Sequence, residues 1–297
     1  MTWIKKGLII APDERHWWNK THAMLPTVSK LHGNFFKIFY SGRDSNGRSQ
    51  IGFSIIEIIA DEIFLRKTSI EPVLEPGERG CFDDNGVTPS CVLDKSLYYI
   101  GWNSGTTTFR MSLIMGLAFE KNNVFIRNSR APLLNKTDRE PFGISTAPYV
   151  IKSKKGFEMW YVSGEGWINR DLPKYNIKYA SSHDGIQWTN NGEVALELLD
   201  KETALARPCI LYDGHTYEMY FSYKDPQIGY RIGYATSSNG KKFQRSQDQS
   251  HYLNVSEEGW DSEMVEYSFV FEHQNIRFML YNGNNYGENG IGYAVKK

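Results

Sequence analysis

The sequence predicts an all-β, five-bladed β-propeller in which each blade is a four-stranded antiparallel sheet. Three observations lead to this fold: a motif that recurs five times, turn residues at short intervals, and an aromatic-rich composition. Aromatic residues make up 14% of the 297 residues, with 18 Tyr and 8 Trp. Large flat rings with a polar edge suit β-rich cores, and they also suit surfaces that bind sugars.

The recurring motif is a strand, a turn, a second aromatic-rich strand, a loop and a third strand. An aromatic residue near the end of each second strand recurs about every 60 residues, at Tyr40, Trp102, Tyr161, Phe221 and Tyr281. Four of the five first strands carry a proline at the same place, at Pro26, Pro89, Pro148 and Pro208. A repeat over the whole chain favours a radial propeller over a β-sandwich with coincidental internal similarity.

A short fourth strand is expected after each of the first four motifs. The segments are 64–69 (FLRKTS), 124–128 (VFIRN), 186–192 (IQWTNNG) and 242–246 (KFQRS). Asp184-Gly185 and Asn239-Gly240 suit tight hairpin turns, because both central residues of such a turn need a positive φ. Short strands with turns this frequent indicate antiparallel sheets.

The fifth motif ends at Lys297 without a fourth strand. Residues 3–10 (WIKKGLII) resemble the fourth-strand segment 188–196 (WTNNGEVAL). We therefore expect the N-terminal strand to complete the last blade and close the ring, which would remove an exposed sheet edge. The prediction is a single domain that spans residues 1–297.

Composition excludes several classes of function. Lys+Arg and Asp+Glu both number 34, which argues against a broad surface for nucleic acid or anionic membrane. The three cysteines fit neither a disulfide framework nor a zinc site. The N-terminal residues do not have the pattern of a signal peptide, so we expect none, and no apolar run is long enough to span a membrane. We expect a cytoplasmic protein with no required cofactor, although clustered acids and His22 would permit a metal ion in the channel.

Candidate catalytic residues follow from the propeller itself. The first strand of each blade lines a central channel, and the loops entering these strands surround one mouth of it. Glycoside chemistry uses two carboxylates across the scissile bond. We predict Asp84 and Glu263 as the acid/base pair, with Asp83 and Glu165 as further candidates. Glu263 and Glu266 are three apart and on an extended segment point to opposite sides, so we expect at most one to face the pocket and favour Glu263.

The predicted substrate-binding residues at this mouth are cations, a histidine, acids, amides and Trp rings. They are His22, Arg43, Trp102, Asn103, Trp167, Glu202, Arg207, Asp261, Asn282 and Asn284. Arg43 and Arg207 would bind anionic groups, and the two Trp rings would stack on sugars. Structural roles remain as alternatives: the Asp83-Asp84 pair precedes Asn85-Gly86 and could cap a turn.

Several segments carry a resemblance to known proteins: FDDNGVTPS, YYIGWN, MWYVSGEGW, IKYASSHDG, YRIGYATSSNG and WDSEM. They resemble a bacterial glycosylase-like propeller family whose members accompany genes for surface-polysaccharide biosynthesis. More broadly, the chain is similar to the superfamily of arabinanases, β-xylosidases, invertase-like β-fructosidases and mannoside phosphorylases. The resemblance covers nearly the whole chain and implies a five-bladed propeller that acts on carbohydrate.

The resemblance also has a gap at the catalytic positions. Arabinanase-type enzymes carry Asp before the strand-start proline of two blades and Glu in a third, whereas this chain has Leu25, Thr88, and Thr146 or Ala147 there. The resemblance therefore implies a carbohydrate-active enzyme whose acids lie elsewhere. Its substrate would be a sugar, sugar phosphate or nucleotide-sugar of surface-glycan metabolism. The alternatives are a non-catalytic glycan-binding or scaffolding propeller and, third, a protein-interaction propeller.

Overall fold

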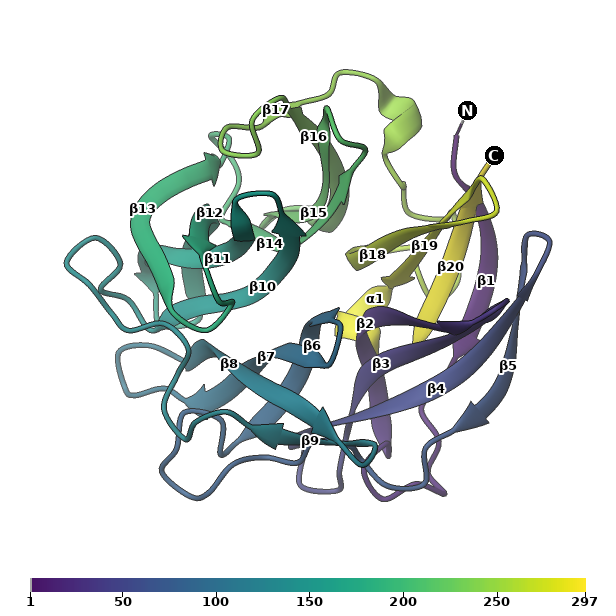
Figure 1. Ribbon diagram of the computed structural model, residues 1–297, viewed down its shortest axis with the longest axis horizontal. Helices are drawn as coiled ribbons and strands as arrows, with labels where there is room; N and C mark the ends of the chain where they lie inside the picture. Colours follow the sequence, from purple (N-terminus) through teal and green to yellow (C-terminus); the bar gives the residue numbers. More distant parts are fainter. Residues whose placement is uncertain (1) are drawn as a thin grey trace.

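The computed structural model describes residues 2–297, and its strands form five sheets arranged around a central axis (Figure 1). Blade one contains β2 (Thr21–His32), β3 (Phe35–Arg43), β4 (Ser49–Ile59) and β5 (Glu62–Thr68). Blade two contains β6 (Gly86–Leu93), β7 (Ser96–Ser104), β8 (Met111–Lys121) and β9 (Val124–Arg127). Blade three contains β10 (Ile144–Ser153), β11 (Gly156–Asn169), β12 (Leu172–Ser182) and β13 (Trp188–Leu196).

Blade four contains β14 (Ala204–Tyr212), β15 (Tyr217–Asp225), β16 (Gly229–Ser237) and the short β17 (Gln244–Arg245), followed by η1 (Gln249–His251). Blade five contains β18 (Glu266–His273), β19 (Ile276–Asn282), the short turn α1 (Asn284–Gly287), β20 (Ile291–Lys296) and β1 (Ile4–Ile10). Within each blade, consecutive strands pair antiparallel. The predicted all-β propeller of five four-stranded blades is confirmed.

The ring is closed by the N-terminal strand, as predicted. β1 pairs antiparallel with β20, with Ile4 opposite Val295 and Ile10 opposite Ile291. The last blade therefore contains both ends of the chain, and the two termini lie close together (Figure 1). Without β1 as its outer strand, the last blade would have β20 as an unpaired edge.

Of the five predicted aromatic repeat positions, Trp102 in blade two is wrong, and Tyr99 takes its place. In blades one, four and five the aromatic residue lies opposite a glycine on the third strand, in the pairs Tyr40–Gly52, Phe221–Gly233 and Tyr281–Gly292. In blade two the residue opposite the matching Gly116 is Tyr99, and Trp102 lies opposite Leu113. A Cβ on Gly116 would lie 2.3 Å from Tyr99 Cζ, so this glycine makes room for the ring.

Each first strand is bent by a β-bulge at or next to the strand-start proline position. The residue before the proline has a left-handed backbone at Leu25, Ala147 and Arg207, and Tyr267 has the same conformation before Ser268. Proline has no N–H to give to a sheet, so a bulge accommodates it without losing a ladder hydrogen bond. A bulge also redirects the neighbouring side chains, here at the channel mouth.

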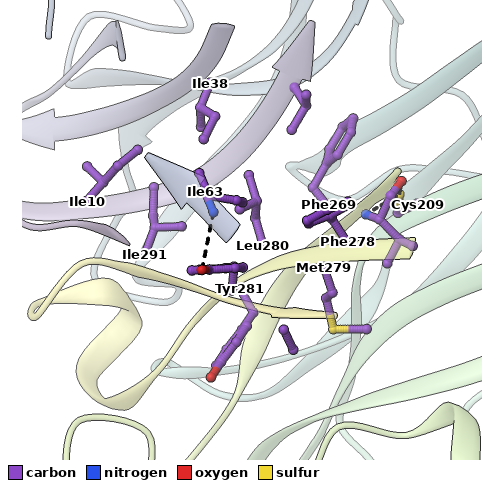
Figure 2. Packing of buried hydrophobic residues seen from close by; sticks show 14 of the residues in the cluster. Ile10, Ile38, Ile63, Cys209, Phe269, Phe278, Met279, Leu280, Tyr281 and Ile291 are labelled. Carbon is purple, nitrogen blue, oxygen red and sulfur yellow. Dashed lines mark hydrogen bonds between the residues drawn. The ribbon is translucent and has the colours of Figure 1, made fainter. Parts of the chain in front are cut away.

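Apolar packing between neighbouring blades forms the core. The largest cluster of buried side chains joins blades one, four and five. Figure 2 shows part of it, with Ile10, Ile38 and Ile63 in the same cluster as Leu280 and Ile291. Separate clusters fill the interfaces between blades one and two, two and three, and three and four. The blades are thus held together mainly by buried apolar contacts between sheets.

Backbone pairing also links most of the blades. Blades one to four are joined by parallel pairing, at Ser49–Gly86, Leu113–Ile144 and Tyr175–Ala204. Blade five is joined to blade four by a backbone hydrogen bond from Val265 N to Tyr230 O, 3.2 Å long.

Blade five is joined to blade one by a side chain. Asn282 Nδ2 donates to Ala23 O at 2.8 Å, and Asn282 Oδ1 accepts from Leu25 N at 2.9 Å. The Asn282 carboxamide therefore donates one hydrogen bond and accepts another across this junction, as backbone peptide groups do where blades are joined by strand pairing.

No helix among residues 2–297 is long and apolar enough to cross a membrane.

Candidate functional site

The acids that enter the first strands form a repeated structural unit, which we call the acid clamp. In blade two, Asp83 is fully buried. Its carboxylate accepts from the Tyr99 hydroxyl at 2.9 Å and from Arg127 Nε at 2.7 Å. Tyr99 lies on the second strand and Arg127 on the fourth, so one carboxylate fastens the entry loop to two strands of its own blade.

The acid clamp recurs in three more blades. The corresponding groups are Glu140 with Tyr161 and Asn190 in blade three, Glu202 with Arg245 in blade four, and Asp261 with Tyr281 and Lys5 in blade five. Blade four has Phe221 in place of the tyrosine, and the Arg245 guanidinium lies 5.0 Å from that ring. The carboxylates of Asp83, Glu202 and Asp261 are therefore bound to protein side chains. We had predicted a catalytic role for Asp83 and substrate binding for the other two.

Glu140 belongs to this repeat and was missed in the sequence analysis. A signal for it exists, because an acid precedes the first strand of blades two to five at nearly the spacing of the whole repeat. An acid at a repeating position is better explained by the architecture of the repeat than by one active site.

The polar residues predicted beside these acids are also engaged in local structure. Asp84 accepts from Gly80 N and from Asn103 Nδ2, both at 2.8 Å, so the alternative of a turn cap fits Asp84. Asn284 Oδ1 accepts from the backbone N–H groups of Glu263 and Met264. Asn282 is fully buried and closes the junction with blade one. These side chains shape the loops of the mouth.

Arg207 lies inside the channel instead of facing a ligand. It is 2% exposed, and it donates to Pro89 O at 2.7 Å, to Pro26 O at 2.6 Å and to Thr27 Oγ1 at 2.6 Å. The guanidinium thus connects the first strands of blades four, two and one. Both terminal nitrogens of the guanidinium therefore bind protein acceptors inside the channel, and not the anionic group that we predicted.

Two predicted residues of blade one do meet at the mouth. Arg43 Nη1 lies 3.3 Å from His22 Nε2. Burial lowers the pKa of His22 to about 4, with Arg43 adding to the effect and Glu288 opposing it. The imidazole is therefore neutral at pH 7. Burial also lowers the pKa of Arg43; Tyr267 opposes this shift, and the nearby Arg110 guanidinium adds to it.

Two of the remaining predicted residues lie beside an apolar cluster that contains Leu25, Ala147 and Ala206. The half-buried rings of Trp102 and Trp167 pack against this cluster. The carboxylate of Glu165 is paired with Lys178 Nζ at 2.9 Å. The side chain of Glu263 is exposed, and its backbone carbonyl accepts from Arg231.

Glu266 is the acid whose environment is most unusual. It is the first residue of β18, it is fully buried, and neither carboxyl oxygen has a hydrogen-bond partner within residues 2–297. Burial raises the pKa of Glu266 well above its ordinary value, and the positive charge of Lys224 offsets only part of this effect. Burial without a hydrogen-bond partner favours the neutral form of a carboxyl, the form in which the proton donors of many enzymes act.

Tyrosines and a lysine surround this carboxyl. Tyr175 and Tyr230 share a hydrogen bond of 2.7 Å between their hydroxyls, and Tyr230 packs against Tyr267 with ring centroids 5.8 Å apart. Lys224 Nζ lies 5.4 Å from the Tyr230 ring centroid and 3.3 Å from the Tyr286 hydroxyl. Lys224 therefore places a positive charge near the buried carboxyl of Glu266.

Three cations of this region have no acidic partner. Among the described residues, no carboxylate lies within 4.0 Å of the charged nitrogens of Arg43, Arg110 or Lys224. No group of three or more His, Cys, Asp or Glu side chains in residues 2–297 is arranged to hold a metal ion. The mouth therefore offers positive charge, tyrosine hydroxyls and one buried carboxyl without a hydrogen-bond partner.

Known proteins give the fold a wider context. No family model matches the chain. Its structure resembles one described as "Glycoside hydrolase", with a TM-score of 0.76, 19% identity, and coverage of 100% of this chain and 92% of the other. It also resembles the endo-arabinase from Bacteroides thetaiotaomicron VPI-5482, with a TM-score of 0.58, 12% identity and coverage of 98% of both chains. The fold of the five-bladed propeller glycoside hydrolases is confirmed.

A closer relative by sequence is the "Uncharacterized protein MT1551" of Mycobacterium tuberculosis (strain CDC 1551 / Oshkosh). It is 37% identical over 301 residues, an alignment that covers 99% of this chain and 99% of the relative. The protein therefore belongs to the same family as MT1551.

Proposed function

We propose that the protein makes or breaks a glycosidic bond of a phosphate-bearing sugar at the channel mouth, with Glu266 as the proton donor. The observation that carries the proposal is a buried, partnerless carboxyl next to cations that lack acidic partners. Similarity to glycoside hydrolases supports carbohydrate as the substrate class. A role in surface-glycan metabolism in the cytoplasm is part of the proposal and has the sequence resemblance as its support.

The charges favour an anionic reactant over a second catalytic carboxylate. Glycosidases use a second carboxylate as the base or nucleophile. Here the charged group that acts most strongly on Glu266 is Lys224. Cations such as Arg43 and Lys224 suit a phosphate group. A phosphate oxygen would then form the bond to the anomeric carbon while the glycosidic C–O bond breaks and the Glu266 proton passes to the leaving oxygen.

Access to Glu266 requires a local movement. The side chain is 0% exposed in the free protein, so a substrate must displace a neighbouring group to reach it. Met264 and Tyr267 flank it in sequence and are only partly buried. Catalytic contacts that form only when the substrate is bound are common, and an enclosed carboxyl in the free protein is compatible with a proton donor.

Binding and turnover test the proposal separately. Binding of inorganic phosphate and of a panel of sugar 1-phosphates would be measured by thermal shift and calorimetry. A ligand at about 100 times its Kd adds about 2.7 kcal/mol to stability. Turnover would be followed by phosphorus NMR with oligosaccharide acceptors. We expect Arg43→Ala to weaken phosphate binding at least tenfold, and Glu266→Gln to abolish turnover while it retains binding.

The control is Glu263→Gln, which changes the exposed glutamate three residues earlier and should leave both properties intact. Absence of any phosphate-dependent shift in the wild type would refute the proposal. The second candidate function is non-catalytic glycan binding, which the enclosure of Glu266 favours. It predicts saturable sugar binding without product and no effect of Glu266→Gln.

A further inference from the structure

A second groove lies at the opposite end of the blades from the mouth. It has a volume of about 680 Å³, and we call it the lysine–tyrosine groove; it is lined by Lys152, Lys154, Lys155, Tyr212, Tyr217 and Asn239, among others. The β10–β11 turn supplies the lysines, and the β14–β15 hairpin supplies the tyrosines. β10 starts at the mouth with Ile144 and ends at Ser153, so the groove is remote from Glu266.

The tyrosines of the groove form a fixed aromatic platform. The Tyr212 and Tyr217 rings are stacked, with centroids 4.1 Å apart and planes 22° apart. Tyr217 is buried beneath, and its hydroxyl donates to the buried carboxylate of Glu158 at 3.3 Å. Tyr212 is 45% exposed. Tyr217 covers one face of its ring, and the exposed part of the side chain borders the groove.

The lysines of the groove have no ionic partners. Lys152, Lys154 and Lys155 are all exposed, and none takes part in an ion pair within residues 2–297. The groove lining contains these three unpaired lysines and one acid, the buried Glu158, which is a local excess of positive charge in a chain with no formal net charge. Such an excess attracts anions.

We propose that the lysine–tyrosine groove binds an acidic saccharide, such as a uronate-containing or sulfated oligosaccharide. A sugar ring would stack on the Tyr212 ring while the lysines bind its acidic groups. The proposal does not depend on the proposed function, because none of its residues belongs to the mouth. It gives the protein a second carbohydrate contact, on the face away from Glu266.

Calorimetry at low ionic strength tests the proposal with tetragalacturonate, a hyaluronan tetrasaccharide and a heparin-derived tetrasaccharide. Maltotetraose serves as a neutral control and ADP as a nucleotide control. We expect at least one acidic tetrasaccharide to bind more tightly than both controls. Tyr212→Ala and the double variant Lys154→Ala/Lys155→Ala should each weaken that binding at least tenfold, whereas Tyr212→Phe should retain it, since it keeps the ring.

The variant Arg43→Ala changes the mouth alone and should leave this binding unchanged. The proposal is overturned if none of the acidic tetrasaccharides binds, or if ADP binds more tightly than all of them. It is also overturned if only the lysine variants reduce binding, because that result would describe a charged surface without a sugar platform.

Discussion

The protonation of Glu266 can be tested through stability, without any substrate. The carboxyl is fully buried without a hydrogen-bond partner, and burial raises its pKa well above the ordinary value of 4.5. In the unfolded chain the same group ionises at its ordinary pKa. As pH rises above that value, the unfolded state loses the proton while the folded state keeps it, so the free energy of unfolding of the wild type falls.

Glu266→Gln removes the titrating group and keeps the size of the side chain. The free energy of unfolding of the variant minus that of the wild type should therefore increase with pH. The increase is up to about 1.4 kcal/mol for each pH unit over which the folded carboxyl stays protonated. Other titrating groups affect both proteins alike, and the difference between them isolates Glu266.

The assay is urea unfolding of both proteins at intervals from about pH 5 to about pH 8, with equal ionic strength throughout. Glu263→Gln is the matched control, because it makes the same substitution at an exposed side chain. If the wild type and Glu266→Gln keep a constant difference across this range, the buried carboxyl is ionised in the folded protein, and its role as a proton donor fails.

Three other predictions concern the architecture. Deletion of residues 2–10 should abolish cooperative unfolding by circular dichroism, because it exposes β20; a melt like that of the full-length protein would contradict closure by β1. Tyr281→Phe should lower the free energy of unfolding by about 1.5–3 kcal/mol, because Asp261 loses a donor; an unchanged urea midpoint would show that the acid clamp in blade five is not stabilising. Arg207→Lys should cost at least about 2 kcal/mol, because one ammonium cannot reproduce the spread of a guanidinium; equal stability in the same assay would argue against its role inside the channel.

The fold could be predicted because the evidence for it is repeated along the chain. Each blade carries its own turns and aromatic strands, so one poorly aligned repeat does not change the conclusion. Blade two shows the limit of this reasoning. Its second strand contains both Tyr99 and Trp102, and only the position of Gly116 on the next strand shows which ring occupies the repeating place.

The site was harder to predict because its chemistry depends on partners from other strands. Asp83 and Asp261 look like free acids in the sequence, but Arg127 and Lys5 are distant in the chain and pair with them only after folding. The alternation of side chains allowed only one of Glu263 and Glu266 to face inward. The structure buries Glu266 and leaves Glu263 exposed. No sequence pattern indicated that this carboxyl would lack a partner.

The junction made by Asn282 has a consequence for the chemical ageing of the protein. Asn282 is followed by Gly283, and asparagine before glycine is prone to deamidation, because glycine has no side chain to shield the reacting backbone nitrogen. Conversion to aspartate would remove the donor to Ala23 and bury a new acid. The closed ring buries Asn282 completely, and so it protects the residue that closes it. Each transient opening between blades five and one exposes that residue to irreversible damage, so the lifetime of the protein depends on how seldom this junction opens.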